Sequence, residues 1–243
     1  MRCVLISCFC FPFAYPSVTG LAIDRTEKLR YLRPAGLQFI CECEFTLTRA
    51  ENGSTIESLT QRGPTKLIVS SQHDEKDLLK AAQVTLVANE QKKTAAVSVA
   101  AGKVRVLRDA QAAQEFDVPK GVIVTSAPDW TDAFLLCRRY DRRKGGKQVF
   151  AGLWIHPVEA GQRLTLAIER HGAASIAHAG KKMQLDSFTL WLRGNSSYAA
   201  WADANGTLIK LAPLPFKKNA VNWLVLDGYE KSAAELQPKS QEE

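Results

Sequence analysis

Short segments in which apolar and polar residues alternate account for most of the chain. The first clear segment begins after Leu37, and its apolar positions are Phe39, Cys41, Cys43 and Phe45. A period of two is typical of a β-strand with at least one buried face. Similar segments follow roughly every eight to twelve residues. The last of this series, Lys103 to Arg108, has Val104 and Leu107 as its apolar positions.

Turn signals separate these segments. Asn52-Gly53 is a strong hairpin signal because both residues tolerate positive φ, and Gly63-Pro64 marks the next turn. The strands are not separated by helical segments of the length that a parallel crossover needs. The pattern therefore predicts an antiparallel meander. It resumes at Val149 and continues to Leu226.

One segment has the period of a helix instead. Its apolar residues are spaced three and four apart, at Ala133, Leu136, Cys137 and Tyr140. Ser126 or Asp129 can cap its N-terminus, and Pro128 suits the first turn. We predict a helix over about residues 128–142. The predicted fold is mainly β: a curved antiparallel meander or an open half-barrel, with one inserted helix covering a face.

The remaining segments set the domain bounds. Residues 37–228 form one predicted β-rich domain, with a lead-in over 21–36 and a charged C-terminal tail over 229–243. Residues 1–20 are similar to a signal or lipoprotein leader, because Arg2 precedes an apolar run and small residues occur near Gly20. Alternatively, the true start lies upstream, or the segment is a folded element. No later segment has the roughly 20 apolar residues of a membrane-spanning helix.

The leader sets the expected location. With it, the protein is exported and is either periplasmic or anchored to the membrane as a lipoprotein. If the N-terminus is not a signal, the protein is cytoplasmic.

Positive charge is concentrated in one place. The net charge is +7, and residues 138–147, RRYDRRKGGK, hold six cations and one acid, Asp141. One interpretation is a solvated loop, and the other is contact with a lipid or another anionic envelope component. Nucleic acid is not expected, because Tyr140 is the only aromatic residue in the run and no recognition motif is present.

The sequence contains no catalytic or cofactor motif that names a reaction. Gly145-Gly146-Lys147 lacks the first glycine and the final hydroxyl residue of a phosphate loop. Asp129, Asp132 and His156 could form an acid–base set, although carboxylates in a first helical turn also suit the helix dipole. The histidines and cysteines lack the spacing of metal sites, so we predict neither a metal nor a cofactor.

Two stretches, Ser126 to Pro157 and Ala200 to Leu211, carry a resemblance. With them, the chain from about Tyr31 to Leu236 resembles a family of uncharacterised exported bacterial proteins, which implies no activity. The meander, the inserted helix and the Asp203-Ala-Asn-Gly206 hairpin are loosely similar to envelope proteins with a curved antiparallel sheet, such as periplasmic lipoprotein carriers. That analogy implies shelter for acyl chains between sheet and helix.

These observations favour a non-enzymatic cell-envelope protein that binds an amphiphilic or anionic ligand in a groove between sheet and helix. Two alternatives remain open: an interaction module that docks an acidic partner through residues 138–147, and an enzyme with an unrecognised site. The expected ligand contacts are aromatic residues and the cations at the end of the helix: Trp130, Phe134, Arg138, Arg139, Arg142, Arg143, Lys144 and Trp154.

Overall fold

The computed structural model describes residues 23–36, 38–109, 111–126, 130–193, 196–215 and 223–237, with only the backbone for Ile23, Asp24, Trp130 and Arg193. The predicted leader at 1–20 and the predicted cap residues Pro128 and Asp129 lie outside these residues.

Within the described residues, one sheet contains fifteen strands. In chain order they are β1 (Ile23–Ala35), β2 (Gln38–Ala50), β3 (Gly53–Arg62), β4 (Thr65–His73), β5 (Leu79–Ala88), β6 (Gln91–Ala100), β7 (Lys103–Arg108), β8 (Gln114–Asp117), β9 (Ile123–Thr125), β10 (Lys147–Trp154), β11 (Gln162–His178), β12 (Lys181–Arg193), β13 (Ser196–Ala202), β14 (Leu208–Pro213) and β15 (Leu224–Leu226). The helix α1 (Trp130–Arg139) lies between β9 and β10 in the chain.

The sheet is two meanders joined at the centre of the sheet. Strands β1 to β8 pair in chain order, and β9 to β15 run back from the other edge until β15 pairs with β1. Neighbouring strands are antiparallel except β9 and β10, which pair in parallel. The predicted class, a mainly β antiparallel meander with one inserted helix, is confirmed. The edge strands β8 and β9 are separated by only residues 118–122 in the chain, and we call the gap between them the seam.

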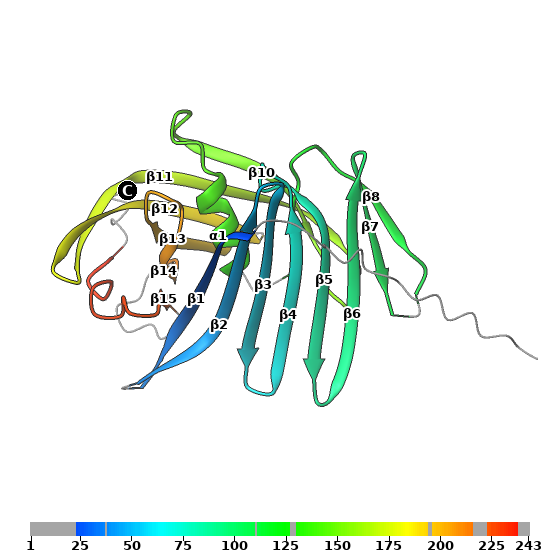
Figure 1. Cartoon of the computed structure of the whole chain (residues 1–243), viewed down its shortest axis with the longest axis horizontal. Coiled ribbons are helices and arrows are strands. Elements are labelled where there is room, and N and C mark those ends of the chain that lie inside the picture. The colour runs from blue at the N-terminus through cyan, green and yellow to red at the C-terminus, as the bar shows by residue number, and fades with distance from the viewer. Residues whose placement is uncertain are drawn as a thin grey trace, which may run out of the picture.

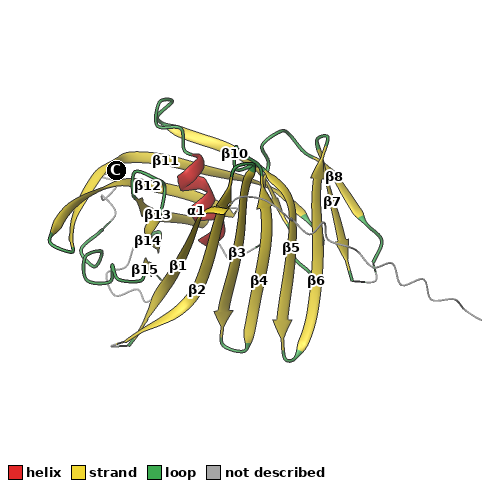
Figure 2. Cartoon of the chain, in the orientation of Figure 1, coloured by secondary structure: helices red, strands yellow, loops and turns green. Residues whose placement is uncertain are grey.

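Helix α1 lies inside the curved sheet. Strands β1 to β6 cross the front of the molecule and β10 to β13 run behind them, with α1 between the two halves (Figures 1 and 2). The predicted stripe is buried, but Phe134 and Leu135 on the other sides of the helix are buried as well. A helix that is apolar all round belongs in a core. The helix therefore packs into the curved sheet and covers its inner face, as predicted.

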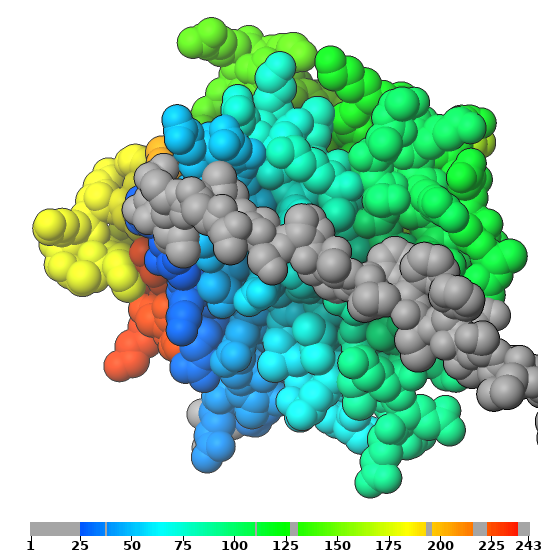
Figure 3. All heavy atoms as spheres, turned by 45° about the vertical axis from the view of Figure 1, so that its right-hand side comes forward, coloured from blue at the N-terminus to red at the C-terminus, as the bar shows by residue number. Residues whose placement is uncertain are grey.

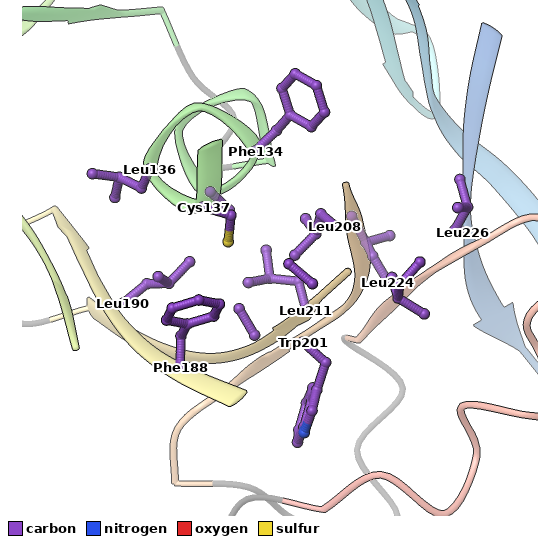
Figure 4. Packing of buried hydrophobic residues seen from close by; sticks show 14 of the residues in the cluster. Phe134, Leu136, Cys137, Phe188, Leu190, Trp201, Leu208, Leu211, Leu224 and Leu226 are labelled. Atoms are coloured by element: carbon purple, nitrogen blue, oxygen red, sulfur yellow. The ribbon is translucent and has the colours of Figure 1, made fainter. Parts of the chain in front are cut away.

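Packing around α1 joins both halves of the sheet. Phe134 stacks on Phe45 of β2 with ring centroids 5.8 Å apart, and Tyr140 meets Phe188 of β12 edge to face at 5.2 Å. Figure 4 shows Cys137 directed toward the sheet that carries Phe188, while Trp201 projects from its opposite face. One apolar cluster thus holds helix and sheet together.

Residues 21–36, predicted as a lead-in, contain the 13-residue strand β1. Its many charged side chains obscured the alternation, yet its long pairing with β2 gives them partners. Arg30 lies opposite Glu44 and reaches it at 3.3 Å. A register shift beside Tyr31 accompanies the buried Glu42, whose carboxylate accepts 2.6 Å bonds from Arg33 and Arg62. Ion pairs therefore provide partners for the charged side chains of β1, which lies at the centre of the sheet.

The predicted charged tail also differs from the structure. Ala233 and Leu236 are buried, and the Tyr229 ring stacks on His178 at 3.9 Å. Figure 3 shows this red segment beneath the projecting yellow hairpin of β11 and β12. The buried Lys210 donates to the carbonyl oxygens of Ala233 at 2.9 Å and Leu236 at 2.8 Å. A cation suits carbonyl groups left at the end of a turn, so Lys210 fixes the segment to the sheet.

The turn between β13 and β14 presses on α1. Gly206 in this turn has φ +77°, and a Cβ built there would lie 2.8 Å from Cα of Arg138. Asp203 shapes the turn, because its carboxylate accepts from the backbone N–H groups of Asn205 and Thr207, each at 2.8 Å. The two sequence stretches that carried the resemblance therefore meet at this contact.

We predict that Gly206→Ala lowers the free energy of unfolding much more than Gly180→Ala. Gly180 has a similar φ of +74° but no atom within 4 Å of a built Cβ, so its substitution costs only about 1 kcal/mol of backbone strain. Gly206→Ala adds an overpacking cost of about 1 to 3 kcal/mol. Denaturant unfolding of both variants measures the difference, and equal losses would contradict the contact with Arg138.

We also predict a pH-dependent contribution from Lys210. Burial lowers the pKa of Lys210 from 10.5 to about 8. Between these values the unfolded chain keeps the proton that the folded chain releases, so stability rises with pH. The stability of the native sequence relative to Lys210→Met should increase by at most about 3 kcal/mol between pH 7.5 and pH 10. Unfolding curves across that range test this, and a constant difference would contradict it.

Candidate functional site

Arg138 at the end of α1 is an internal ion-pair residue. Its Nη2 donates to both carboxylate oxygens of Asp77, at 3.0 and 3.2 Å, and its side chain is 8% exposed. Burial lowers the pKa of Arg138, and the neighbouring Asp77 charge raises it. Asp77 lies in the loop between β4 and β5, with a φ of 56°. Arg138, the first of the cations predicted to contact a ligand, therefore binds this loop.

Arg139 also binds the β4–β5 loop. It donates to the backbone oxygen of Asp77 and, at 3.2 Å, to that of Gly121 beside the seam. The buried His73 ring contacts the Asp77 carbonyl through Nδ1 at 3.3 Å and Ser71 through Nε2 at 3.0 Å. Burial lowers the pKa of His73, so the ring is neutral at pH 7. Hydrogen bonds from Arg138 and Arg139 thus connect the helix end to the β4–β5 loop and to Gly121.

Arg142 binds across to the second half of the sheet. Its Nε donates to Asp186 at 2.7 Å, and its other amino groups donate to the carbonyl oxygens of Ala204 at 2.8 Å and Asp203 at 3.1 Å. Asp186 also accepts from Arg170 at 2.7 Å. This third cation thus stabilises the turn that packs on α1.

The loop that follows α1 holds the exposed cations. Arg143 and Lys144 are exposed, and Lys144 lies 3.9 Å from Asp141 with 76% of its side chain in solvent. Gln148 ties the loop together, because its amide accepts from the N–H of Asp141 at 3.0 Å and donates to its C=O at 2.7 Å. The cations are therefore presented on an ordered loop.

Apolar surface adjoins these cations. Val149 on β10 is 62% exposed, and Nζ of Lys147 lies 3.9 Å from the ring centroid of Trp191 on β12. Val149 and Trp191 share a row of the sheet, each paired with Ala167 of β11. We call Arg143, Lys144, Lys147 and Val149 the loop surface. It combines positive charge with an exposed apolar side chain.

The predicted ligand residues are not brought into one site. Phe134 belongs to the core, Arg138, Arg139 and Arg142 hold loops, and only Arg143 and Lys144 are on the loop surface. Trp154 is half-buried and stacks on His156 at the end of β10 away from the loop. Trp130 begins α1, but its side chain lies outside the described part of the chain.

Of the acid–base set, Asp129 lies outside the described residues. The buried Asp132 accepts a 2.5 Å bond from Thr125, and Nδ1 of His156 accepts from the backbone N–H of Val158 at 3.3 Å. Among the residues that the structure describes, no group of three or more acidic, histidine or cysteine side chains is placed to hold a metal ion. In the same residues, no helix has the length and apolar character that crossing a membrane requires.

Sequence reasoning missed the partners of the basic residues, chiefly Asp77 and Asp186. Each lies more than forty positions from its arginine in the chain, since Asp77 pairs with Arg138 at a separation of 61 and Asp186 pairs with Arg142 at 44. Local charge density indicates the cations but not these carboxylates.

Comparison with known proteins adds fold similarity. No protein-family model and no curated protein matches the sequence. The fold resembles the crystal structure of a β-barrel-like protein of the domain of unknown function DUF1849 from Brucella abortus, with a TM-score of 0.52, 10% identity, and coverage of 83% of this chain and 93% of that one. A DUF1089 family protein from Pseudomonas aeruginosa aligns with a TM-score of 0.46, 15% identity, and coverage of 72% and 92%. The expected likeness to uncharacterised domains is confirmed at the level of fold.

We predict that Asp77→Asn destabilises the protein by about 2 to 4 kcal/mol, because it leaves Arg138 buried without its counter-charge. Asparagine tolerates the positive φ at this position, so the backbone is not the cause of the loss. Asp141→Asn is the matched control, since its pair with Lys144 is exposed and contributes little. Denaturant unfolding compares the two, and similar small losses would contradict the assigned role of Asp77.

Proposed function

We propose that the protein is a non-enzymatic protein of the cell envelope that docks on anionic lipid through the loop surface. The observation that carries the proposal is the placement of Arg143 and Lys144 on an ordered loop that leads directly into Lys147 and the exposed Val149 of β10. Basic side chains next to an anionic membrane each contribute about 1 kcal/mol. Three such cations support reversible, salt-sensitive binding.

The location forms part of the same proposal. It rests on the leader-like pattern over residues 1–20, where one basic residue precedes an apolar run. A lipid-anchored or periplasmic protein meets anionic headgroups at close range, and two weak membrane attachments together bind more firmly than either alone. N-terminal sequencing of the protein from the envelope fraction tests the export step.

We predict that Arg143→Glu with Lys144→Glu lowers binding to vesicles rich in phosphatidylglycerol more than tenfold at low salt. Each reversal replaces an attraction of about 1 kcal/mol with a repulsion. Lys92→Glu with Lys93→Glu is the matched control, because it makes the same charge change at exposed positions on β6. Vesicle co-sedimentation at 25 and 200 mM salt measures the effect, expected to weaken at the higher salt.

Three outcomes would overturn the lipid assignment. The first is equal binding to uncharged phosphatidylcholine vesicles, and the second is an equal loss in both double variants. The third is binding of an acidic protein or polymer through the loop surface with none to vesicles, which would establish an interaction module instead.

A further inference from the structure

Another basic residue lies inside the molecule, at the seam. Arg108 ends strand β7, and it shares the inward face of that strand with Val104 and Val106. Only 4% of Arg108 is exposed. This position places a guanidinium group next to the apolar cluster that contains Val84, Val97, Val104, Val106, Leu153 and Ile155.

The hydrogen bonds of Arg108 leave part of the group unused. Its Nε donates to the backbone oxygen of His156 at 2.9 Å, and its Nη1 donates to Oε1 of Gln114 at 2.7 Å. Its buried Nη2 has no hydrogen-bond partner among the described residues. Two neutral oxygens thus meet a group that offers five N–H donors.

No carboxylate in the described part of the chain forms an ion pair with Arg108. Burial lowers its pKa, and no neighbouring charge counteracts that effect. Arg138 and Arg142, by contrast, each reach an aspartate. A buried charge without a counter-ion costs several kcal/mol. An unsatisfied buried donor in a folded protein requires an explanation, and a missing anion is one of the few available.

The seam beside Arg108 has features that would let a ligand enter. Strand β8 has only four residues and pairs on one side, with β7. Its contacts across the seam include a 2.9 Å bond from Arg163 to the Asp117 carbonyl and the packing of Phe116 near Gly161. Short edge elements with few backbone bonds open at low cost. Phe116 of this strand packs against the buried apolar cluster of the first meander.

We propose that Arg108 binds the oxyanion headgroup, carboxylate or phosphate, of a single-chain amphiphile that enters at the seam between β8 and β9. The proposal does not depend on the loop surface, which is at a different site. Nη1 and Nη2 form the outer fork of the guanidinium, and such a fork binds two oxygens of one anion side by side. Gln114 occupies half of that fork with a neutral amide oxygen, while His156 holds Nε from the other side.

Binding then exchanges one acceptor for another. The anion displaces the Gln114 amide, takes both outer nitrogens and supplies the counter-charge that Arg108 lacks. The hydrocarbon chain lies against the apolar cluster, where each buried methylene contributes about 0.8 kcal/mol. Both parts of the ligand are required, because the charge selects the headgroup and the chain supplies affinity.

Isothermal titration calorimetry with five probes tests this. The probes are laurate, dodecyl phosphate, dodecanol, acetate and inorganic phosphate, with each amphiphile kept below its micelle concentration. We expect laurate or dodecyl phosphate to bind at least tenfold more tightly than the other three, and their ratio identifies the headgroup. Dodecanol that binds as tightly as the anionic amphiphiles, or no binding of either anionic amphiphile, would overturn the proposal.

Variants on the two sides of the guanidinium sharpen the test. Arg108→Met should weaken binding of the preferred anionic probe at least tenfold, and Gln114→Ala should strengthen it severalfold by removing the competing oxygen. Arg105→Met is the matched control, an arginine on the outward face of the same strand, and it should leave the affinity unchanged. An unchanged affinity in Arg108→Met, or equal losses in Arg108→Met and Arg105→Met, would refute the assignment.

Folding is controlled separately. Circular dichroism and denaturant unfolding should show Arg108→Met folded, because an apolar residue replaces a buried charge without a counter-ion. If that variant does not fold, Arg108→Lys retains the charge but loses the fork, and it should still bind the preferred probe at least tenfold more weakly. Native affinity in Arg108→Lys would refute the bidentate contact.

Discussion

The enclosure of α1 inside the sheet is the constraint on which the rest of the molecule depends. Once both halves of the sheet pack on the helix, the cations at its C-terminal end are removed from water and need partners. Asp77 supplies its carboxylate to Arg138 and its carbonyl oxygen to Arg139. The helix therefore organises the loops around its end: an ion pair holds the β4–β5 loop, and a hydrogen bond from Arg139 to the Gly121 carbonyl holds residues 118–122.

The enclosure of α1 also explains why the family resemblance is carried by two stretches far apart in the chain, Ser126 to Pro157 and Ala200 to Leu211. Arg142 donates to the carbonyl oxygens of the turn that contains Gly206, and Gly206 itself contacts the backbone of Arg138. Each stretch needs the other: the turn needs a glycine because the helix is close, and the arginine needs carbonyl groups that this turn leaves open. Half of the cations in a basic segment that looks like an exposed surface in the sequence, Arg138, Arg139 and Arg142, instead bind neighbouring loops and turns.

Alternation predicted most strands because a half-buried strand must alternate, and it failed where other interactions replaced burial. The charged strand β1 is stabilised by cross-strand pairs such as Arg30 with Glu44, which no local pattern reveals. In β7 the inward row is Val104, Val106 and Arg108, whereas the apolar residues suggested Val104 and Leu107. Strict period two would have placed Arg108 inside, so a signal for this residue was present. The ion-pair partners remained hidden because they are distant in the chain.

A buried arginine with a carboxylate partner and one without differ in how much of their desolvation cost the folded chain offsets. Arg138 has a carboxylate partner in the folded chain, so its charge is offset there and helps to fix the structure. Arg108 has only neutral acceptors, so folding alone leaves part of its desolvation cost without an offset. A buried guanidinium without a counter-ion lowers the free energy of unfolding unless a bound anion supplies the opposite charge. The stability of the apolar cluster beside Arg108 allows the fold to accommodate this cost. A carboxylate partner, rather than positive charge alone, therefore distinguishes Arg138, which stabilises the fold, from Arg108, which we propose binds an anion.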